Sequence, residues 1–270
     1  MQYDPIKRSL GNVFNKSPFL RKLFYALLDL LLLRAWHVHK VLKEWRKGPG
    51  KGKDIKILDA GSGFGQYSYY LAGMDPSFEI TAVDVKQEQV DDCNQFFKVA
   101  GRTNAKFEMG DLTRYVKENY YDLVLSVDVM EHILEDVLVF RNLNASMKPG
   151  AMLIISTPSD QGGSDVQEDD EHSFIEEHVR DGYNIQDIQN KLKQAGFTRI
   201  EAGYAYGSPG KIAWRISMKW PIQLLGISKL FFIILPFYYL LFYPFAFFLN
   251  MADTHGKHKT GTGLIVKAWK

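Results

Sequence analysis

The sequence predicts an α/β fold in which the strands of a largely parallel sheet alternate with helices. Short apolar segments at 55–59, 79–84, 121–128 and 151–158 have the length and composition of buried strands. Stretches of helical length separate them, and a turn with glycine at every second position follows the first segment. This order is typical of domains that bind nucleotide-like ligands at the carboxyl ends of their strands.

The first strand leads directly into the glycine-rich turn. Residues 55–60 read Ile-Lys-Ile-Leu-Asp-Ala, and Gly61, Gly63 and Gly65 follow. Glycine allows a tight turn and lets a ligand approach the backbone closely, because no Cβ is in the way. A helix predicted from about Gln66 to Ala72 would point its N-terminus at that ligand. A glycine turn alone also occurs as a plain tight turn, so the downstream pattern decides between the two.

Acidic residues end the later strands at positions that suit such a ligand. Asp84 ends the second strand at the distance from the glycine turn where a carboxylate accepts hydrogen bonds from ribose hydroxyls. Asp111 lies in the third predicted strand segment, 107–112, and Asp128 ends the fourth. The fifth strand comes after a turn predicted at Lys148-Pro149-Gly150.

Together these segments resemble the class I S-adenosylmethionine (SAM) dependent methyltransferases over roughly residues 53–206, nearest to the ubiquinone- and menaquinone-pathway type. A dinucleotide-binding dehydrogenase would share the glycine turn and Asp84, but it is not expected to show the later motifs. The resemblance implies a Rossmann-like, seven-stranded methyltransferase sheet. The matching motifs are Leu58-Asp59-Ala60-Gly61-Ser62-Gly63-Phe64-Gly65, Val83-Asp84, Gly110-Asp111-Leu112, Tyr121-Asp122-Leu123-Val124 and Met147-Lys148-Pro149-Gly150.

The resemblance also implies SAM as the cofactor and a role for each motif. The backbone around Gly61 and Gly63 would contact the methionine part of SAM, with Asp59 close to its amino group. Asp84 would hold the ribose, and Asp111 would flank the adenine. The expected cofactor-binding residues are Asp59, Gly61, Ser62, Gly63, Gly65, Asp84, Val85, Asp111, Leu112 and Asp128.

The expected catalytic residues follow the fourth strand. Methyl transfer requires donor and acceptor to be aligned and a hydroxyl or carbon acid to lose its proton. His132 is the candidate base, with Glu131 and Asp128 beside it. In ubiquinone-pathway O-methyltransferases a Glu-x-x-Glu-His cluster has been linked to a divalent metal, and Asp128 stands here in place of the first Glu. The alternative is that Glu131 and His132 only cap the next helix, and we assign no metal ligand.

Charge is distributed unevenly along the 270 residues. Residues 1–53 carry 12 Lys and Arg against 3 Asp and Glu, and residues 207–270 carry 8 against 1. The intervening residues carry 13 against 27. Basic ends that are also the most apolar parts of the chain favour an anionic membrane surface over nucleic acid as partner. The single cysteine, Cys93, excludes an internal disulfide framework.

The N-terminal region, 1–52, contains a predicted basic amphipathic helix from about Pro18 to Trp45. Its apolar centre, Leu23 to Leu33, is interrupted by Asp29 and is too short to span a bilayer. A helix lying in the membrane interface is one interpretation. A cap over the active site, as in many methyltransferases of this kind, is the other, and the two are compatible.

The segment Leu230–Met251 is uncharged, rich in aromatic residues and long enough to span a membrane. It lies between the predicted sixth and seventh strands, 198–204 and 263–269, within an insertion at 207–260. Because neighbouring strands of one sheet share one side of a membrane, the insertion must enter and return. We therefore predict a shallow apolar helical hairpin or a kinked in-plane helix, broken at Pro236 or Pro244. A lid over a hydrophobic substrate pocket is the alternative to membrane contact, and 261–270 would be the final strand of the 53–206 core.

The sequence thus predicts a SAM-dependent methyltransferase that modifies a lipophilic small molecule, preferably at oxygen. The enzyme would lie on the cytoplasmic face of a membrane, as a peripheral or monotopic protein, without nucleic acid as a partner. A homodimer formed through the hairpin is the alternative use of the apolar surface. Two other functions remain open: SAM-dependent non-methylating or N- or C-modifying chemistry on a quinone or lipid headgroup, and a non-catalytic SAM-binding membrane protein.

Overall fold

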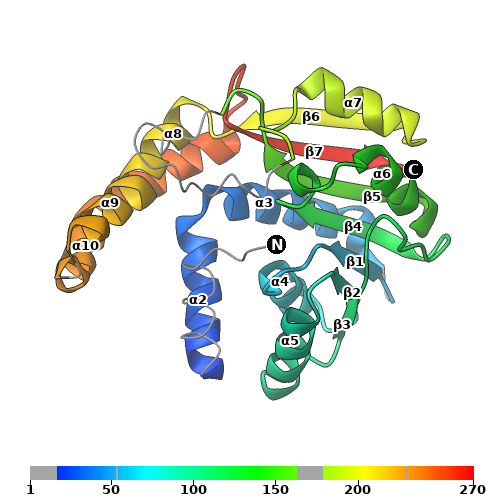
Figure 1. The fold of residues 1–270 in the computed structure, drawn as a ribbon, viewed down its shortest axis with the longest axis horizontal. Helices are drawn as coiled ribbons and strands as arrows, with labels where there is room; N and C mark the ends of the chain where they lie inside the picture. Colours follow the sequence, from blue (N-terminus) through cyan, green and yellow to red (C-terminus); the bar gives the residue numbers. More distant parts are fainter. Residues whose placement is uncertain (1–16, 53, 163–178, 229) are drawn as a thin grey trace.

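The computed structural model describes residues 17–52, 54–162, 179–228 and 230–270. A seven-stranded sheet with the order β3-β2-β1-β4-β5-β7-β6 forms the centre of the molecule (Figure 1). Neighbouring strands from β3 to β5 are parallel, and β7 lies antiparallel between β5 and β6. The predicted α/β methyltransferase sheet is confirmed. The strands are β1 (Lys56–Ala60), β2 (Glu79–Asp84), β3 (Ala105–Met109), β4 (Tyr121–Val127), β5 (Met147–Pro158), β6 (Arg199–Ala205) and β7 (Gly263–Trp269).

Helices cover both faces of the sheet, because alternate residues of each buried strand point to opposite sides. Ile57 and Leu125 belong to a core that includes side chains of α3, α4 and α5. Leu58 and Val124, their chain neighbours, belong to a second core with α6 and α7. The helices named here are α3 (Leu33–Lys47), α4 (Gln66–Met74), α5 (Gln87–Val99), α6 (Asp136–Ser146) and α7 (Ile185–Gln194).

Two strand boundaries differ from the prediction. The third strand ends at Met109, so Gly110 and Asp111 belong to the loop that follows it. The predicted turn at 148–150 is part of β5, where the register shifts against β4 between Tyr121 and Leu123. A bulge with Gly150 at φ +79° accommodates the extra residues.

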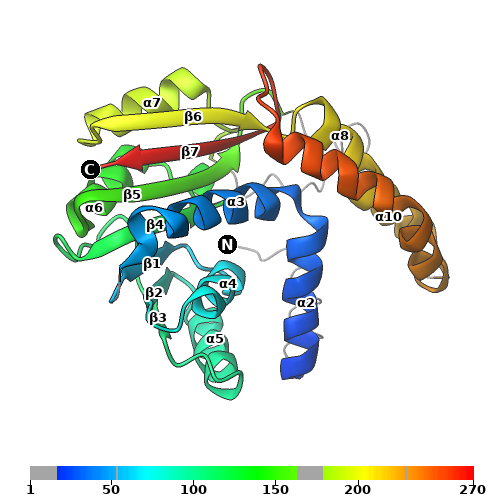
Figure 2. The ribbon, with the colours of Figure 1, turned by 180° about the vertical axis from the view of Figure 1, so that it is seen from behind.

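The predicted single helix from Pro18 to Trp45 is wrong, since two helices occupy this segment. They are α2 (Pro18–Leu31) and α3, and Leu32 between them has an extended backbone with φ −90° and ψ 111°. The break lets α2 leave the direction of α3 (Figures 1 and 2). In its new direction α2 reaches the glycine-rich turn, which a continuous helix would pass by.

The insertion between β6 and β7 is a helical hairpin (Figure 2). Its outward limb consists of α8 (Ser208–Trp214), the π-helical turn η3 (Arg215–Lys219) and α9 (Trp220–Ile227), and its return limb is α10 (Phe231–His255). The expected break at Pro236 or Pro244 is wrong, because α10 runs through both prolines. The chain reverses instead at Ser228, which caps α9 in an extended conformation.

Tyrosines of α10 hold the two limbs of the hairpin together. Tyr238 and Tyr239 donate hydrogen bonds to the carbonyl oxygens of Ile216 and Ser217, at 2.8 and 2.9 Å. Both acceptors lie in η3, where a π-helical turn alters the regular carbonyl pairing. The hairpin therefore has specific polar contacts between its limbs although its composition is almost entirely apolar.

Asp253 anchors the root of the hairpin to the rest of the domain. Its buried carboxylate accepts hydrogen bonds from the backbone N–H groups of Tyr206 and Gly210, at 3.2 and 3.0 Å. The same carboxylate lies 2.8 Å from Nε2 of His37 on α3 and 3.3 Å from Nε2 of His258. One side chain of α10 thus joins the hairpin, α3 and the connection that leaves β6.

Candidate functional site: a cofactor cleft with an adjoining cavity

The glycine-rich turn has the conformation that its sequence predicts. Gly61 has φ +84°, and a Cβ at this position would lie 2.3 Å from Cγ2 of Val129. Gly63 has φ +51°, and a Cβ there would have no atom within 4 Å. Gly61 is therefore required by packing as well as conformation, whereas Gly63 leaves open space beside the backbone, which a ligand requires.

Asp84 lies against this turn, as expected for a ribose-binding carboxylate. Its Oδ2 accepts a hydrogen bond from the N–H of Gly63 at 2.9 Å, and its Oδ1 accepts one from the N–H of Lys86 at 3.0 Å. Val85, between them, is exposed. The sheet thus brings the first and second predicted motifs into direct contact.

Asp59 lies buried at the end of β1. Its Oδ2 accepts a hydrogen bond from Oγ of Ser68 at 2.6 Å. Burial raises the pKa of the Asp59 carboxyl to about 6, against the effect of the Ser68 hydrogen bond, and the nearby charge of Asp84 adds to the increase. A bound ammonium group would favour the ionised carboxylate, which is consistent with the expected contact to the amino group of SAM.

Asp111 and Leu112 follow β3 on the same edge of the sheet. Oδ1 of Asp111 accepts hydrogen bonds from the N–H and the hydroxyl of Thr113, at 2.9 and 2.8 Å. These bonds hold the pKa of the Asp111 carboxyl below its ordinary value. Leu112 is buried, and the N–H of Gly110 donates to the carbonyl oxygen of Asp84 at 3.0 Å. The loop after β3 is therefore joined to the end of β2.

Asp128 follows β4 in a left-handed conformation, with φ +51°. Such a backbone is unfavourable for a residue other than glycine and occurs often at functional sites. Its carboxylate forms an ion pair with Arg34 of α3, and its N–H donates to the carbonyl oxygen of Ser156 at 2.8 Å. Asp128 therefore connects the cofactor edge of the sheet to the helix that covers it.

Glu131 and His132 lie in the 3-10 turn η2 (Met130–His132) directly after this point. Glu131 is buried, and its carboxylate accepts a hydrogen bond from Thr157 Oγ1 at 3.0 Å. Burial raises the pKa of the Glu131 carboxyl despite the nearby charge of His132. Among the described residues, no group of His, Cys, Asp or Glu side chains has an arrangement suited to a metal ion.

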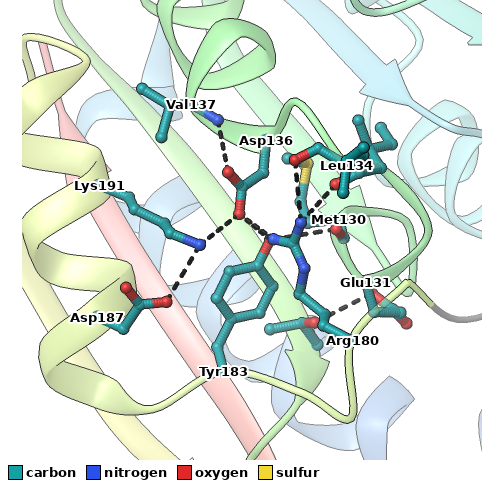
Figure 3. A network of polar contacts seen from close by, with 11 residues as sticks. Met130, Glu131, Leu134, Asp136, Val137, Arg180, Tyr183, Asp187 and Lys191 are labelled. Carbon is teal, nitrogen blue, oxygen red and sulfur yellow. Dashed lines mark hydrogen bonds and ion pairs between the residues drawn. The ribbon is translucent and has the colours of Figure 1, made fainter.

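A buried polar network fixes η2 against α7 (Figure 3). The Asp136 carboxylate pairs with Arg180 and with Lys191, whose Nζ lies 2.8 Å from Oδ2, and it accepts a hydrogen bond from Tyr183 at 2.8 Å. Burial alone would raise the pKa of the Asp136 carboxyl, but these partners outweigh burial and lower it. The Tyr183 hydroxyl is also 3.1 Å from the carbonyl oxygen of Met130, the first residue of η2.

A cavity of about 190 Å³ lies beside Asp128, at the carboxyl ends of β4 and β5. Arg34 and His37 of α3 form one wall, and Trp214 of α8, at the root of the hairpin, forms another. The remaining lining residues come from β5, the end of β6 and the start of β7. They are Ser156, Thr157, Pro158, Ala205, Tyr206, Thr262, Gly263 and Leu264.

Three residues of this cavity were not predicted as site residues from the sequence: Arg34, His37 and Tyr206. Arg34 pairs with Asp128, and its backbone N–H donates to the Tyr206 hydroxyl at 3.0 Å. Tyr206 itself has a left-handed backbone, with φ +57°. His132, in contrast, does not line this cavity. The sequence pattern that could have indicated the first two is the spacing of Arg34, His37 and Lys40, three residues apart on one helix. Basic side chains in a helix at a membrane surface would give the same pattern.

The residues of the cleft fit the cofactor that the motifs imply. Gly63 leaves room at the turn, Asp84 is a carboxylate at a strand end, and Asp59 is a buried carboxyl whose raised pKa a cation would lower. A seven-stranded sheet with one antiparallel strand and this cleft defines the class of SAM-dependent methyltransferase domains.

A comparison with known families gives the same result. The profile of a family described as "Methyltransferase domain" matches residues 51–201. The chain belongs to this family, and its cofactor is SAM. The match ends before the hairpin, so nothing in it concerns residues 206–262.

Individual relatives are distant. Phosphoethanolamine N-methyltransferase 1 of Arabidopsis thaliana is 29% identical over 165 residues, which cover 54% of this chain and 29% of that protein. The ubiquinone biosynthesis O-methyltransferase of Rickettsia felis is 29% identical over 103 residues, 38% of this chain and 41% of that protein. The chain spans less than half the length of these relatives.

Among solved structures, phosphoethanolamine N-methyltransferase 2 of Haemonchus contortus, in complex with phosphomonomethylethanolamine and S-adenosylhomocysteine, has a similar fold. The TM-score is 0.58 with 18% identity, covering 86% of this chain and 52% of that one. At 18% identity this similarity shows a common fold, and it does not identify the molecule that accepts the methyl group.

The two glycines of the turn predict different effects of the same substitution. Gly63→Ala adds a Cβ where the protein has space, so it should cost only about 1–2 kcal/mol of unfolding free energy for its left-handed backbone and weaken S-adenosylhomocysteine binding about tenfold or more. Gly61→Ala adds the contact with Val129 and should cost about 3 kcal/mol or more. Denaturant unfolding and calorimetric titration measure both effects. Equal binding by Gly63→Ala and the wild type would contradict a ligand-facing role for Gly63.

The raised pKa of Asp59 predicts a pH dependence of cofactor binding. With a carboxyl pKa of about 6, protonation below that pH removes the negative charge that attracts an ammonium group. S-adenosylhomocysteine affinity should therefore fall as the pH drops from 7 to 5, and it should be nearly constant above 7. Asp59→Asn should bind more weakly, with a flat profile over this range. Titrations of both proteins test this, and an unchanged slope in Asp59→Asn would assign the pH dependence to another group.

The Asp136 network predicts a large loss of stability when its carboxylate is removed. Asp136→Asn removes the buried carboxylate that two partly buried cations share, and it should lower the unfolding free energy by about 3 kcal/mol. Asp187→Asn removes an exposed carboxylate that contacts the same Lys191, and it should cost less than about 0.5 kcal/mol. Since the folded pKa of Asp136 is lowered, its contribution is present above the unfolded pKa of about 3.9 and is lost as the pH falls. Equal losses in the two variants at pH 7 would contradict this account.

Proposed function

We propose that the protein transfers the methyl group of SAM to a hydroxyl oxygen of a lipophilic small molecule at a membrane surface. The observation that carries this proposal is the cavity beside Asp128, because it joins the cofactor edge of the sheet to the root of the apolar hairpin. An acceptor in this cavity would lie between Asp128 and Trp214. The methyl donor and a membrane-bound acceptor thereby meet at one place.

His37 supports hydroxyl activation in the cavity. Its Nε2 is 2.8 Å from the buried Asp253 carboxylate, so that bond orients the ring and leaves Nδ1 as the nitrogen for a ligand. When bound, SAM would supply a methyl group on a sulfonium: a bond would form from the acceptor oxygen to the methyl carbon while the carbon–sulfur bond breaks, with S-adenosylhomocysteine as the leaving group. His37 would take the hydroxyl proton during this displacement. His132, the base expected from the sequence, lies one turn beyond Asp128 and is the alternative.

The exposed surface of the hairpin supports a lipophilic acceptor and a membrane partner. Of the described helices, α10 alone is long and apolar enough to cross a membrane, judged by length and composition, and only 6% of its most apolar window is buried. The insertion leaves and rejoins the sheet at the paired residues Ala205 and Gly263, so it must enter a bilayer and return. With a basic excess at both ends of the chain, this favours a monotopic enzyme on the anionic cytoplasmic face.

A second candidate is N-methylation of a phosphorylated amine or lipid headgroup. Two observations favour it: the phosphoethanolamine N-methyltransferases among the relatives, and the guanidinium of Arg34 in the cavity wall. The Nε of Arg34 is buried without a hydrogen-bond partner, and a phosphate oxygen would supply one. O-methylation remains our first choice because a hydroxyl acceptor requires the base that His37 provides.

A label-transfer assay tests the proposed function. The full-length protein is incubated with methyl-labelled SAM and two probes in vesicles, a dodecyl-substituted catechol and phosphatidylethanolamine. We expect label in the extracted catechol and S-adenosylhomocysteine in equal amount. Label only in phosphatidylethanolamine would support the second candidate, and S-adenosylhomocysteine without labelled lipid would favour non-methylating chemistry. No turnover of either probe, despite SAM binding, would contradict both candidates.

Three variants identify the base in the same assay. His37→Gln keeps a donor for Asp253 but accepts no proton, so kcat should fall about 100-fold or more at neutral pH. The deficit should shrink as the pH rises, because hydroxide then removes the acceptor proton. His258→Gln alters a second partner of the same carboxylate outside the cavity, and its kcat should change less than about threefold. A large loss in His132→Gln with a normal His37→Gln would assign the base to His132.

A further inference from the structure

Helix α2 has its polar side turned toward the protein and an apolar side turned outward. Arg21 and Tyr25 are only 4% and 2% exposed. Phe19, Leu23, Leu27 and Leu30, which we call the α2 stripe, are 71%, 42%, 38% and 41% exposed. Their spacing places them along one side of the helix. A surface helix of a water-soluble domain normally has the opposite arrangement, so the α2 stripe requires an apolar partner.

The inner side of α2 holds the cofactor turn. The Nη2 atom of Arg21 donates to the carbonyl oxygen of Phe64 at 3.1 Å, and Nε donates to the Tyr25 hydroxyl at 3.0 Å. The Tyr25 hydroxyl in turn donates to the same carbonyl oxygen. Phe64 lies between Gly63 and Gly65, so α2 directly contacts the turn that surrounds the cofactor site.

Two further contacts connect α2 to its surroundings. Asp29 accepts a hydrogen bond from Gln66, the first residue of α4, at 2.7 Å. At its other end, the carbonyl oxygen of Leu30 accepts hydrogen bonds from Trp36 and from Tyr243 of α10, at 3.0 and 2.6 Å. The end of the α2 stripe therefore adjoins the exposed apolar surface of the hairpin.

The charges around these helices suit an anionic partner. The acidic residues of α2 and of the described part of the hairpin are Asp29 and Asp253, and both are hydrogen-bonded inward. Exposed basic side chains remain at the edges, at Lys22, Lys211 and Arg215. A second copy of this chain would present the same basic edges and repel them, whereas an anionic bilayer attracts them.

We propose that the α2 stripe and the exposed apolar surface of the hairpin form one docking surface for an anionic lipid bilayer. We further propose that docking of α2 tightens cofactor binding. This inference rests on the membrane contact in the proposed function. The extended backbone of Leu32 separates α2 from α3, so the direction of α3 does not fix the position of α2. The contacts of its own side chains hold α2 in place. A bilayer that binds the outer side stabilises α2 against the cofactor turn. By linkage, the bound cofactor must strengthen membrane binding by the same factor.

The test measures S-adenosylhomocysteine affinity of the full-length protein with and without vesicles of phosphatidylglycerol and phosphatidylcholine. Flotation first establishes the lipid concentration at which all protein is bound. We expect the affinity to rise about fivefold or more on the vesicles. The double substitution Leu23→Ser/Leu27→Ser should abolish this increase while the protein still floats through its hairpin. Its affinity without vesicles should equal that of the wild type.

A matched hairpin variant completes the experiment. Phe237→Ser/Leu240→Ser removes two exposed apolar side chains of α10 and should weaken flotation but keep the rise in affinity once the protein is fully bound. Unchanged affinity in protein that floats would overturn the coupling and leave the membrane proposal standing. If the protein does not float and light scattering shows a dimer, the surface binds a second copy of the chain. That result would overturn both the membrane proposal and the coupling to cofactor binding. A rise that persists in the α2 variant would exclude α2 as the coupling element.

Discussion

The antiparallel pairing of β6 with β7 is the constraint on which the rest of the structure depends. Because β7 lies between β5 and β6, both ends of the 57-residue stretch from 206 to 262 are fixed at the carboxyl edge of the sheet. This is the edge where the parallel strands place their loops and where such folds bind ligands. The apolar hairpin must therefore begin and end beside the cofactor cleft, and its root becomes a wall of the cavity.

Helix α3 converts this topology into a site. It covers one face of the sheet, and at its N-terminal end Arg34 reaches Asp128 on the cofactor side and His37 reaches Asp253 on the hairpin side. Each of the two acids belongs to a different structural unit, so the helix joins both to one cavity. The left-handed backbone of Asp128 and Tyr206 beside this helix is an energetic cost that the surrounding contacts offset.

Local physical constraints made the sheet and the cofactor turn predictable from the sequence. Buried parallel strands require continuous apolar runs, and the turn requires glycine at Gly61, where a Cβ would overlap Val129. The break at Leu32 left no such signal, because leucine is a good helix former. The tertiary contacts that hold α2 beyond the break, made by Arg21 and Tyr25, are not visible in the sequence. In α10 the opposite occurred: Pro236 and Pro244 predicted a helix break, but the helix continues through both prolines. Arg34 and His37 were missed because their role depends on where α3 lies over the sheet.

In the proposed function the hairpin enters a bilayer and returns, and it would thereby hold the carboxyl edge of the sheet at the membrane. Because Cys93 is buried, single introduced cysteines are labelled selectively. A spin label at I227C, near the reversal of the hairpin, should become accessible to oxygen and inaccessible to a water-soluble nickel complex when vesicles are added. A label at V99C, exposed at the end of α5, should remain accessible to the nickel complex. Equal access of the nickel complex to both labels on vesicles that bind the protein would contradict the claim.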